Sequence, residues 1–183
     1  MVKVLISEPG ELNAAQLLAA EELVRSAFGS AFRSHDWLHA VDGVHIVLSD
    51  AEQSMIGFAA VVRRTLCHNE VTFDTGYIEA VAIRADQQGL GLGRMVMDHA
   101  EHIVNTRYQL GALNAVETAA PFYEARGWQP WTGHTQAVGS TGIIDTYDDA
   151  DRIYLLGAEK NGHGQPLTAD TALICDWRPG DLW

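Results

Sequence analysis

An apolar strand that runs into a glycine-rich turn and then into a helix is the feature that most constrains this sequence. Residues 77–83 are largely apolar, and Gly89, Gly91 and Gly93 follow shortly after them. Glycines let a backbone approach a ligand closely, and the start of a helix adds a partial positive charge. The segment therefore predicts an anion site suited to a pyrophosphate. A glycine-rich turn that binds nothing is the alternative.

Two known phosphate-binding motifs do not fit this turn. A P-loop needs a Lys-Ser or Lys-Thr pair that is absent here, and the glycine spacing differs from that of a dinucleotide-binding turn. Gln88-x-x-Gly91-x-Gly93 instead resembles the Q/R-x-x-G-x-G/A signature of the GNAT acetyltransferase superfamily. Residues 120–128, which include Tyr123, resemble the LYxxxGF/W element of the same superfamily, although an ordinary core tyrosine is the alternative for Tyr123.

The remaining pattern predicts a mixed α/β fold of the α+β class, in which helices flank a mostly antiparallel central sheet. Asn13 and Gln16 form a capping-box pattern that predicts a first helix. Together with the resemblance, this predicts a single GNAT acyltransferase domain over residues 1–183. The expected strands are residues 2–7, 44–48, 55–64, 71–83, 108–113, 128–138, 151–158 and 171–175, and the later helices are 36–40, 89–106 and 117–126.

Composition narrows the class of partner. The formal net charge of −12 argues against a nucleic-acid-binding protein, which needs a basic face for phosphates. It fits a cationic ligand, although acidity that only keeps the protein soluble is the alternative. No apolar run is long enough to span a membrane, and Cys67 and Cys175 form no CxxC pair. We expect a cytoplasmic protein with no membrane partner.

The resemblance narrows to the aminoglycoside 2′-N-acetyltransferases and covers the chain from about residue 27 to residue 183. The segments that carry it are Asp36-Trp37 and residues 43–45, 76–79, 108–113, 127–131 and 175–183. It implies transfer of an acetyl group from acetyl-coenzyme A to the 2′-amine of an aminoglycoside antibiotic, which would give antibiotic resistance. It also implies a homodimer, and the reaction needs no metal ion.

The same resemblance implies a role for each matching residue. Glu79 would remove a proton from the amine, directly or through water, with a purely structural carboxylate as the alternative. The Val81 amide would polarise the acetyl carbonyl, and Tyr123 would protonate the departing thiolate. Coenzyme A would contact Val81, Ala82, Ile83, Gln88, Gly89, Leu90, Gly91, Leu92, Gly93 and Arg94. The acceptor would contact Asp36, Glu79, Ala80, Asn114, Asp148, Asp149, Asp181 and Trp183, including the terminal carboxylate of Trp183.

Three departures from the family pattern lie on the acceptor side. Ala31 replaces an acidic residue, Ala80 a glycine and Asn114 a serine. Losing one carboxylate favours an acceptor with fewer ammonium groups, and kasugamycin, which carries a carboxylate of its own, fits. Arg63, Arg64 or another cation would then face that carboxylate. The other hypotheses are a transferase for another small-molecule or peptide amine, and a non-catalytic acyl-coenzyme A-binding module.

Overall fold

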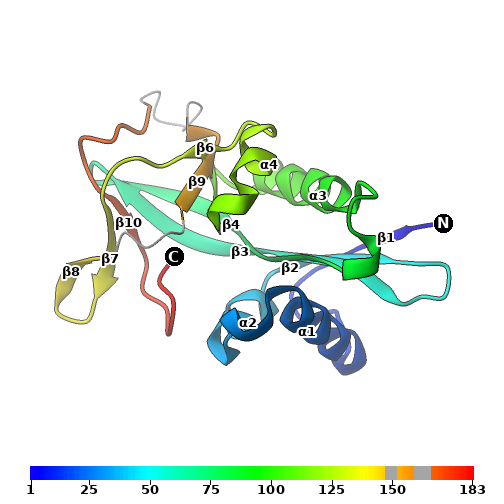
Figure 1. Ribbon diagram of the computed structural model, residues 1–183. Coiled ribbons are helices and arrows are strands. Elements are labelled where there is room, and N and C mark those ends of the chain that lie inside the picture. Colours follow the sequence, from blue (N-terminus) through cyan, green and yellow to red (C-terminus); the bar gives the residue numbers. More distant parts are fainter. Residues whose placement is uncertain (147–151, 159–165) are drawn as a thin grey trace. The chain divides into compact units, whose positions relative to one another are not determined.

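The computed structural model describes residues 1–146, 152–158 and 166–183, which form two compact units (Figure 1). Unit 1 comprises Met1–Val62 and Ile78–Ile103, and unit 2 comprises Arg63–Tyr77 and Val104–Trp183. Strands β3 (Met55–His68) and β4 (Val71–Ile83) and helix α3 (Leu92–Arg107) each pass from one unit into the other. Each unit has its own cluster of buried apolar side chains.

Unit 1 is built on strands β1 (Lys3–Ser7) and β2 (Val44–Ser49) and the first half of β3, which pair antiparallel in that order. Helices α1 (Ala14–Phe28) and α2 (Ser34–Val41) lie on one face of these strands, and the short helix η1 (Gly29–Ala31) joins them (Figure 1). The predicted capping box starts α1, because the side chains of Asn13 and Gln16 each accept a hydrogen bond from the other's backbone amide. The core of unit 1 contains Leu12, Ala20, Leu23, Val24, Trp37, Ala40, Val47, Phe58, Ala60 and Ala82.

Unit 2 contains strands from widely separated parts of the chain. Its strand order is β6-β9-β5-β4-β3-β10-β7-β8, where β7 and β10 pair parallel and the pairs β5–β9, β6–β9, β3–β10 and β7–β8 are antiparallel. The added strands are β5 (Leu110–Ala115), β6 (Gln129–Pro130), β7 (Thr135–Gly139), β8 (Gly142–Asp145), β9 (Arg152–Leu156) and β10 (Leu173–Cys175). The short helices η3 (Glu117–Ala119) and α4 (Ala120–Glu124) precede β6.

The predicted α+β class is confirmed, and the bounds of three expected elements are corrected. The helix expected over residues 89–106 begins at Leu92, because Gly89 and Gly91 are left-handed. The helix expected over 117–126 is only η3 and α4, and the strand expected over 128–138 divides into β6 and β7. Strand β8 was not predicted. No helix in the described part of the chain is long and apolar enough to cross a membrane.

Strand β4 contains a backbone irregularity at Ala80, which has φ +56°. The other described non-glycine residues with positive φ, which are Gln53, Asn69 and Glu70, lie between strands rather than inside one. A left-handed residue interrupts the regular pleat, so its backbone groups cannot continue the ladder on both sides. Residues 79–81 are also less buried than residues 75–78 before them. The irregularity therefore lies in a less buried stretch of β4, just before buried Ala82.

We expect Ala80→Gly to leave the free energy of unfolding unchanged or to raise it by up to about 1 kcal/mol. Glycine removes the left-handed strain of alanine, which costs about 1–2 kcal/mol, while its extra freedom in the unfolded chain offsets part of that gain. Ala80→Val should lower the free energy of unfolding by about 1 kcal/mol or more, because a branched side chain tolerates positive φ poorly. Urea titrations measure both values.

The matched control is Ala82→Gly, two residues further along the same strand, where φ is not positive. Glycine there relieves no strain and removes a buried methyl group, so it should destabilise the protein by about 1 kcal/mol. Equal losses for glycine at positions 80 and 82 would contradict the strain at Ala80.

Candidate functional site

The glycine-rich turn in unit 1 connects β4 to α3 through the short helix η2 (Ala85–Gln87). Gly89 and Gly91 have φ of +76° and +81°, and a Cβ atom at either position would meet nothing within 4 Å. Glycine is therefore required by the backbone conformation and not by crowding. The Gln88 side chain closes the turn by donating a hydrogen bond from Nε2 to the Ile83 carbonyl (3.1 Å).

Helix α3 starts directly after this turn. The first hydrogen bond of the helix runs from the Met95 amide to the Gly91 carbonyl (3.2 Å). The amides of the residues before Met95 therefore have no acceptor within the helix. Buried Leu92 anchors the first turn, while Gly89, Leu90, Gly91 and Arg94 are exposed. Open space, free amides and the helix dipole together fit the pyrophosphate of coenzyme A. The predicted residues from Gln88 to Arg94 thus form one continuous segment, made of the turn and the first residues of α3, which we call the Gln88–Arg94 loop.

The other residues predicted for unit 1 lie around the Ala80 irregularity and on α2. Glu79 and Val81 flank Ala80 and are half-buried, and Ala82 and Ile83 complete the strand. Asp36 lies in the first turn of α2, where its carboxylate accepts a hydrogen bond from the Arg33 amide (2.6 Å) and contacts the His35 ring (3.2 Å). Asp36 therefore already caps the helix that carries it.

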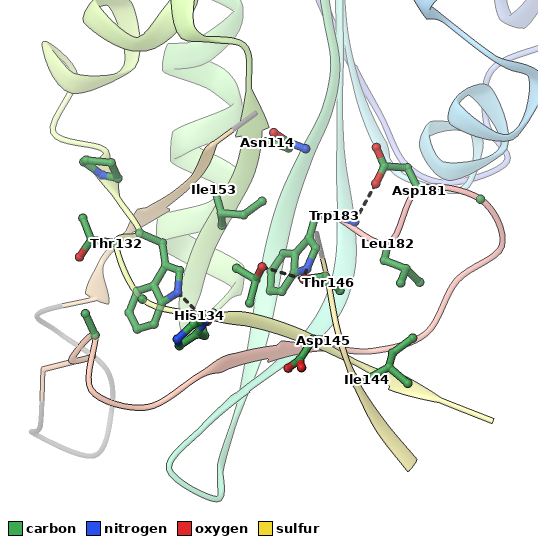
Figure 2. Close-up of a pocket in the computed structure, with 16 residues that line it drawn as sticks. Asn114, Thr132, His134, Ile144, Asp145, Thr146, Ile153, Asp181, Leu182 and Trp183 are labelled. Atoms are coloured by element: carbon green, nitrogen blue, oxygen red, sulfur yellow. Dashed lines mark hydrogen bonds between the residues drawn. The ribbon is translucent and has the colours of Figure 1, made fainter. Parts of the chain in front are cut away.

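Unit 2 contains a pocket of about 830 Å³ (Figure 2). Three of the residues predicted to contact the acceptor line it, namely Asn114 on β5, Asp181 and Trp183. The Trp183 indole Nε1–H donates to Thr146 Oγ1 (3.0 Å), and the Thr146 hydroxyl donates to Thr135 Oγ1 (2.6 Å). Trp183 is 8% exposed and belongs to the core of unit 2, whereas Trp177 is 61% exposed.

The pocket is also lined by residues that are not among the predicted acceptor contacts. Trp131 donates from its indole to the His134 carbonyl (3.0 Å), and the buried His68 ring packs edge-on against it at 5.6 Å. The exposed carboxylate of Asp145, at the end of β8, accepts a hydrogen bond from Gln136 Nε2 (2.8 Å). Strand β8 was missed, although the Gly-Ser-Thr-Gly turn at residues 139–142 between apolar residues was an available hairpin signal.

The pocket is acidic and has one polar atom with no partner. Asp145 and Asp181 supply carboxylates, and no Arg or Lys occurs among the described residues that line it. The buried Oδ1 of Asn114 has no hydrogen-bond partner within the described ranges. A buried acceptor without a donor is costly, so a ligand with N–H groups would be stabilised there. The pocket can therefore bind a cationic, hydrogen-bond-donating molecule.

Tyr123 lies on α4 in unit 2 and does not line this pocket. Its buried ring packs edge-on against Phe122 and Trp128 and is tilted against Tyr154, with ring centroids 5.2, 6.4 and 6.1 Å away. The Tyr123 carbonyl accepts hydrogen bonds from the amides of Arg126 and Trp128, which end the helix. The aromatic neighbours thus hold the ring in one orientation.

Two further predictions have different outcomes. Asp148 and Asp149 lie outside the described residues. Arg63 and Arg64, which were expected to face a ligand carboxylate, do not line this pocket. The Arg63 guanidinium pairs with Asp74 through two hydrogen bonds, and the Arg64 side chain is 3% exposed and fully surrounded by protein.

Comparisons with known proteins identify the family and the fold. The model of the acetyltransferase (GNAT) family matches residues 13–128. The chain is 38% identical over 164 residues to an aminoglycoside 2′-N-acetyltransferase of Mycolicibacterium fortuitum, which covers 90% of this chain and 83% of that protein. Its fold resembles Escherichia coli ElaA (TM-score 0.61, 17% identity, 85% of this chain and 98% of that chain). It also resembles the ribosomal-protein-S18-alanine N-acetyltransferase of Escherichia coli (TM-score 0.60, 19% identity, 85% and 93%).

The solved structures share the fold at low identity, whereas the family model and the curated relative share sequence over most of the chain. The chain therefore belongs to the GNAT acetyltransferase family and, within it, to the family of aminoglycoside 2′-N-acetyltransferases.

Proposed function

We propose that the protein transfers an acetyl group from acetyl-coenzyme A to the 2′-amine of an aminoglycoside antibiotic, and thereby gives antibiotic resistance. The observation that carries this proposal is the acidic, tryptophan-walled pocket of unit 2, which suits an amino sugar with several ammonium groups. Carboxylates bind such groups with charge-assisted hydrogen bonds. The 38% identical relative, named for this activity, supports the same conclusion.

Acetyl-coenzyme A is the proposed acetyl donor, and its pyrophosphate would bind the amides of the Gln88–Arg94 loop in unit 1. The left-handed Gly89 and Gly91 present open backbone there, and α3 contributes its positive end. Val81, Ala82 and Ile83 would offer backbone hydrogen bonds to the pantetheine arm, because the Ala80 irregularity interrupts the ladder of β4.

The proposed reaction forms a C–N bond and breaks a C–S bond. Glu79 would take a proton from the attacking ammonium group, directly or through water, because only the neutral amine is nucleophilic. The Val81 amide would donate to the acetyl oxygen as negative charge develops on it. Tyr123 would donate its phenolic proton to the departing thiolate of coenzyme A, and the second proton that the acylated nitrogen loses would restore the Tyr123 hydroxyl. The proton held by Glu79 would then leave to solvent.

Two features of the chain favour different acceptors. Asp145, Asp181 and the unpartnered Asn114 oxygen favour a drug with several ammonium groups. Ala31 stands where the family resemblance implies an acidic residue. The missing carboxylate favours a drug with fewer ammonium groups, and kasugamycin is such a drug. Among the described pocket residues, His134 is the one side chain able to carry positive charge toward a drug's carboxylate. We propose deoxystreptamine-type drugs as the first candidates and kasugamycin as the second.

The remaining expectations are part of the same proposal. We propose a cytoplasmic homodimer in which residues 1–183 form one acetyltransferase domain. The cytoplasm is where acetyl-coenzyme A and an imported antibiotic would meet, and the reaction proposed here uses no metal ion.

Acetyl-coenzyme A should raise the melting temperature, because a ligand that binds only the folded state at 100 times its Kd adds about 2.7 kcal/mol of stability. Gly91→Glu should abolish that rise by placing bulk and negative charge where the pyrophosphate binds. The matched control is Gly10→Glu, since Gly10 has φ +83° and equally open surroundings. An intact acetyl-coenzyme A response in Gly91→Glu would contradict the loop assignment.

Thiol release from acetyl-coenzyme A in the presence of an aminoglycoside tests the reaction itself. Tyr123→Phe should lower kcat by about 10²- to 10⁴-fold, as expected for loss of a general acid, with little change in acceptor KM. Glu79→Gln should lose most activity at lower pH, where more of the amine is protonated.

The control for Tyr123 is Tyr154→Phe, which removes a buried hydroxyl from a neighbouring ring. Near wild-type rates in both Tyr123→Phe and Glu79→Gln would overturn the assigned roles. Acetyl-coenzyme A binding without thiol release for any amine would identify a non-catalytic module. Release with peptide amines or polyamines alone would identify a different transferase.

Asp145→Asn and Asp181→Asn should each lower kcat/KM for tobramycin by about tenfold or more, the loss expected for one charge-assisted hydrogen bond. The losses for kasugamycin should be smaller, because it carries fewer ammonium groups. Ala31→Asp should shift preference toward tobramycin.

Glu22→Gln, on the exposed side of α1, is the control for a change in net charge alone. If Asp145→Asn and Glu22→Gln had the same effect, Asp145 would not contact the acceptor.

A further inference from the structure

The segment of residues 176–183 is attached to unit 2 by one buried arginine of β3. Arg64 Nε donates to Asp176 Oδ1 (2.9 Å), Nη2 to the Asp176 carbonyl (2.9 Å) and Nη1 to the Leu182 carbonyl (2.7 Å). One planar guanidinium therefore holds both ends of the segment. Lysine cannot reproduce this, because its single ammonium group is a point charge without the fixed fork of donors.

Neighbouring groups keep Arg64 in this orientation. Its guanidinium carbon lies 5.0 Å from the centroid of the buried Tyr77 ring, which favours a cation at its face. The Thr65 amide donates to Asp176 Oδ2 (3.2 Å), and the Asp176 amide donates to the Thr65 carbonyl (3.0 Å). The segment is thus joined to β3 at adjacent residues.

Two further side chains, those of Arg178 and Cys175, donate hydrogen bonds to backbone carbonyls near the end of the segment. The Arg178 Nε donates to the Asp181 carbonyl (2.7 Å), and its guanidinium carbon lies 5.3 Å from the Tyr77 ring centroid. The Cys175 thiol donates to the Leu182 carbonyl (3.3 Å), and burial raises the pKa of this thiol, so it stays a donor. The Leu182 carbonyl, which lies between Asp181 and Trp183 in the chain, therefore accepts hydrogen bonds from both Arg64 and Cys175.

Those two neighbours, Asp181 and Trp183, both line the acceptor pocket, whereas Arg64 does not (Figure 2). The Trp183 amide donates to Asp181 Oδ1 (3.2 Å), and the Trp183 indole reaches Thr146, so the direction of both side chains depends on the backbone between them. Moving the Leu182 carbonyl would move the carboxylate and the indole together.

We propose that Arg64 is a positioning residue for the acceptor, because it fixes Asp181 and Trp183 in the pocket without touching the acceptor itself. The kinetic part of this proposal rests on the proposed function, since it requires an acceptor bound at Asp181 and Trp183. The structural part, that Arg64 orders Trp183, does not depend on any substrate.

The kinetic test compares Arg64→Met and Arg64→Lys with the control Arg63→Met. Arg63 is the adjacent arginine, but its side chain is 75% exposed and pairs with Asp74 at the surface. Arg64→Met should raise the acceptor KM about tenfold or more, change kcat less than about threefold and leave the KM for acetyl-coenzyme A unchanged. Arg64→Lys should be intermediate, and Arg63→Met should resemble the wild type.

A purely structural role would give a different result. Partial unfolding lowers the active fraction, so kcat would fall while the acceptor KM stayed constant, and that outcome would overturn the proposal. Arg64→Met and Trp183→Ala should also be non-additive in acceptor KM, because both disturb the same group. If Arg64→Met does not fold, Arg64→Lys and Asp176→Asn provide the same comparison.

A spectroscopic test separates this proposal from the proposed function. In ¹H–¹⁵N spectra the chain's five tryptophans give indole signals, and Trp183→Phe identifies that of Trp183. The Trp183 indole proton should exchange with water faster in Arg64→Met than in the wild type or Arg63→Met. Unchanged protection in Arg64→Met would overturn the proposal even if the enzyme acetylates aminoglycosides. Lost protection in a protein that acetylates none would overturn the proposed function alone.

Discussion

The left-handed backbone at Ala80 is the constraint on which the proposed chemistry of unit 1 depends. A β-strand pairs all its amides and carbonyls with neighbouring strands, so a regular β4 would have no backbone group to offer a ligand. One residue with φ +56° interrupts that pattern between Glu79 and Val81, the proposed base and the proposed oxyanion donor. The strain is retained although alanine tolerates this conformation poorly, as occurs where backbone geometry serves a site.

The two units carry chemically different parts of the proposed reaction. Unit 1 contributes backbone amides in the Gln88–Arg94 loop, which suit an anionic cofactor. Unit 2 contributes the carboxylates of Asp145 and Asp181, which suit a cationic acceptor. A net charge of −12 favours a cationic acceptor at long range and disfavours an anionic cofactor, so the proposed cofactor site would depend on local dipoles at a helix start.

Local parts of the site could be predicted from the sequence, and long-range parts could not. The glycine turn and the Asn13 capping box depend on residues a few positions apart, so their spacing alone carries the signal. The position of Asp181 and Trp183 came from a family resemblance. Asp145 and Trp131 were not among the predicted acceptor contacts, because the β7–β8 hairpin brings Asp145 to the pocket and Trp131 reaches it from just after β6. The partners of Arg64 lie 112 and 118 residues away along the chain, a pairing that only sheet register can specify.

The Asn114 side chain adds a second reason, besides the charge of Asp145 and Asp181, for the pocket to favour ammonium groups. Its Oδ1 is buried with no donor among the described residues, and the cost of such an atom is recovered only when a ligand supplies an N–H. Serine, which the family resemblance implies at this position, could rotate its hydroxyl toward a protein acceptor, whereas the asparagine oxygen cannot donate. Substitution by asparagine therefore makes binding at this position depend on a donor from the acceptor. The Oδ1 atom of Asn114 only accepts hydrogen bonds, so a ligand carboxylate placed beside it would find no donor there.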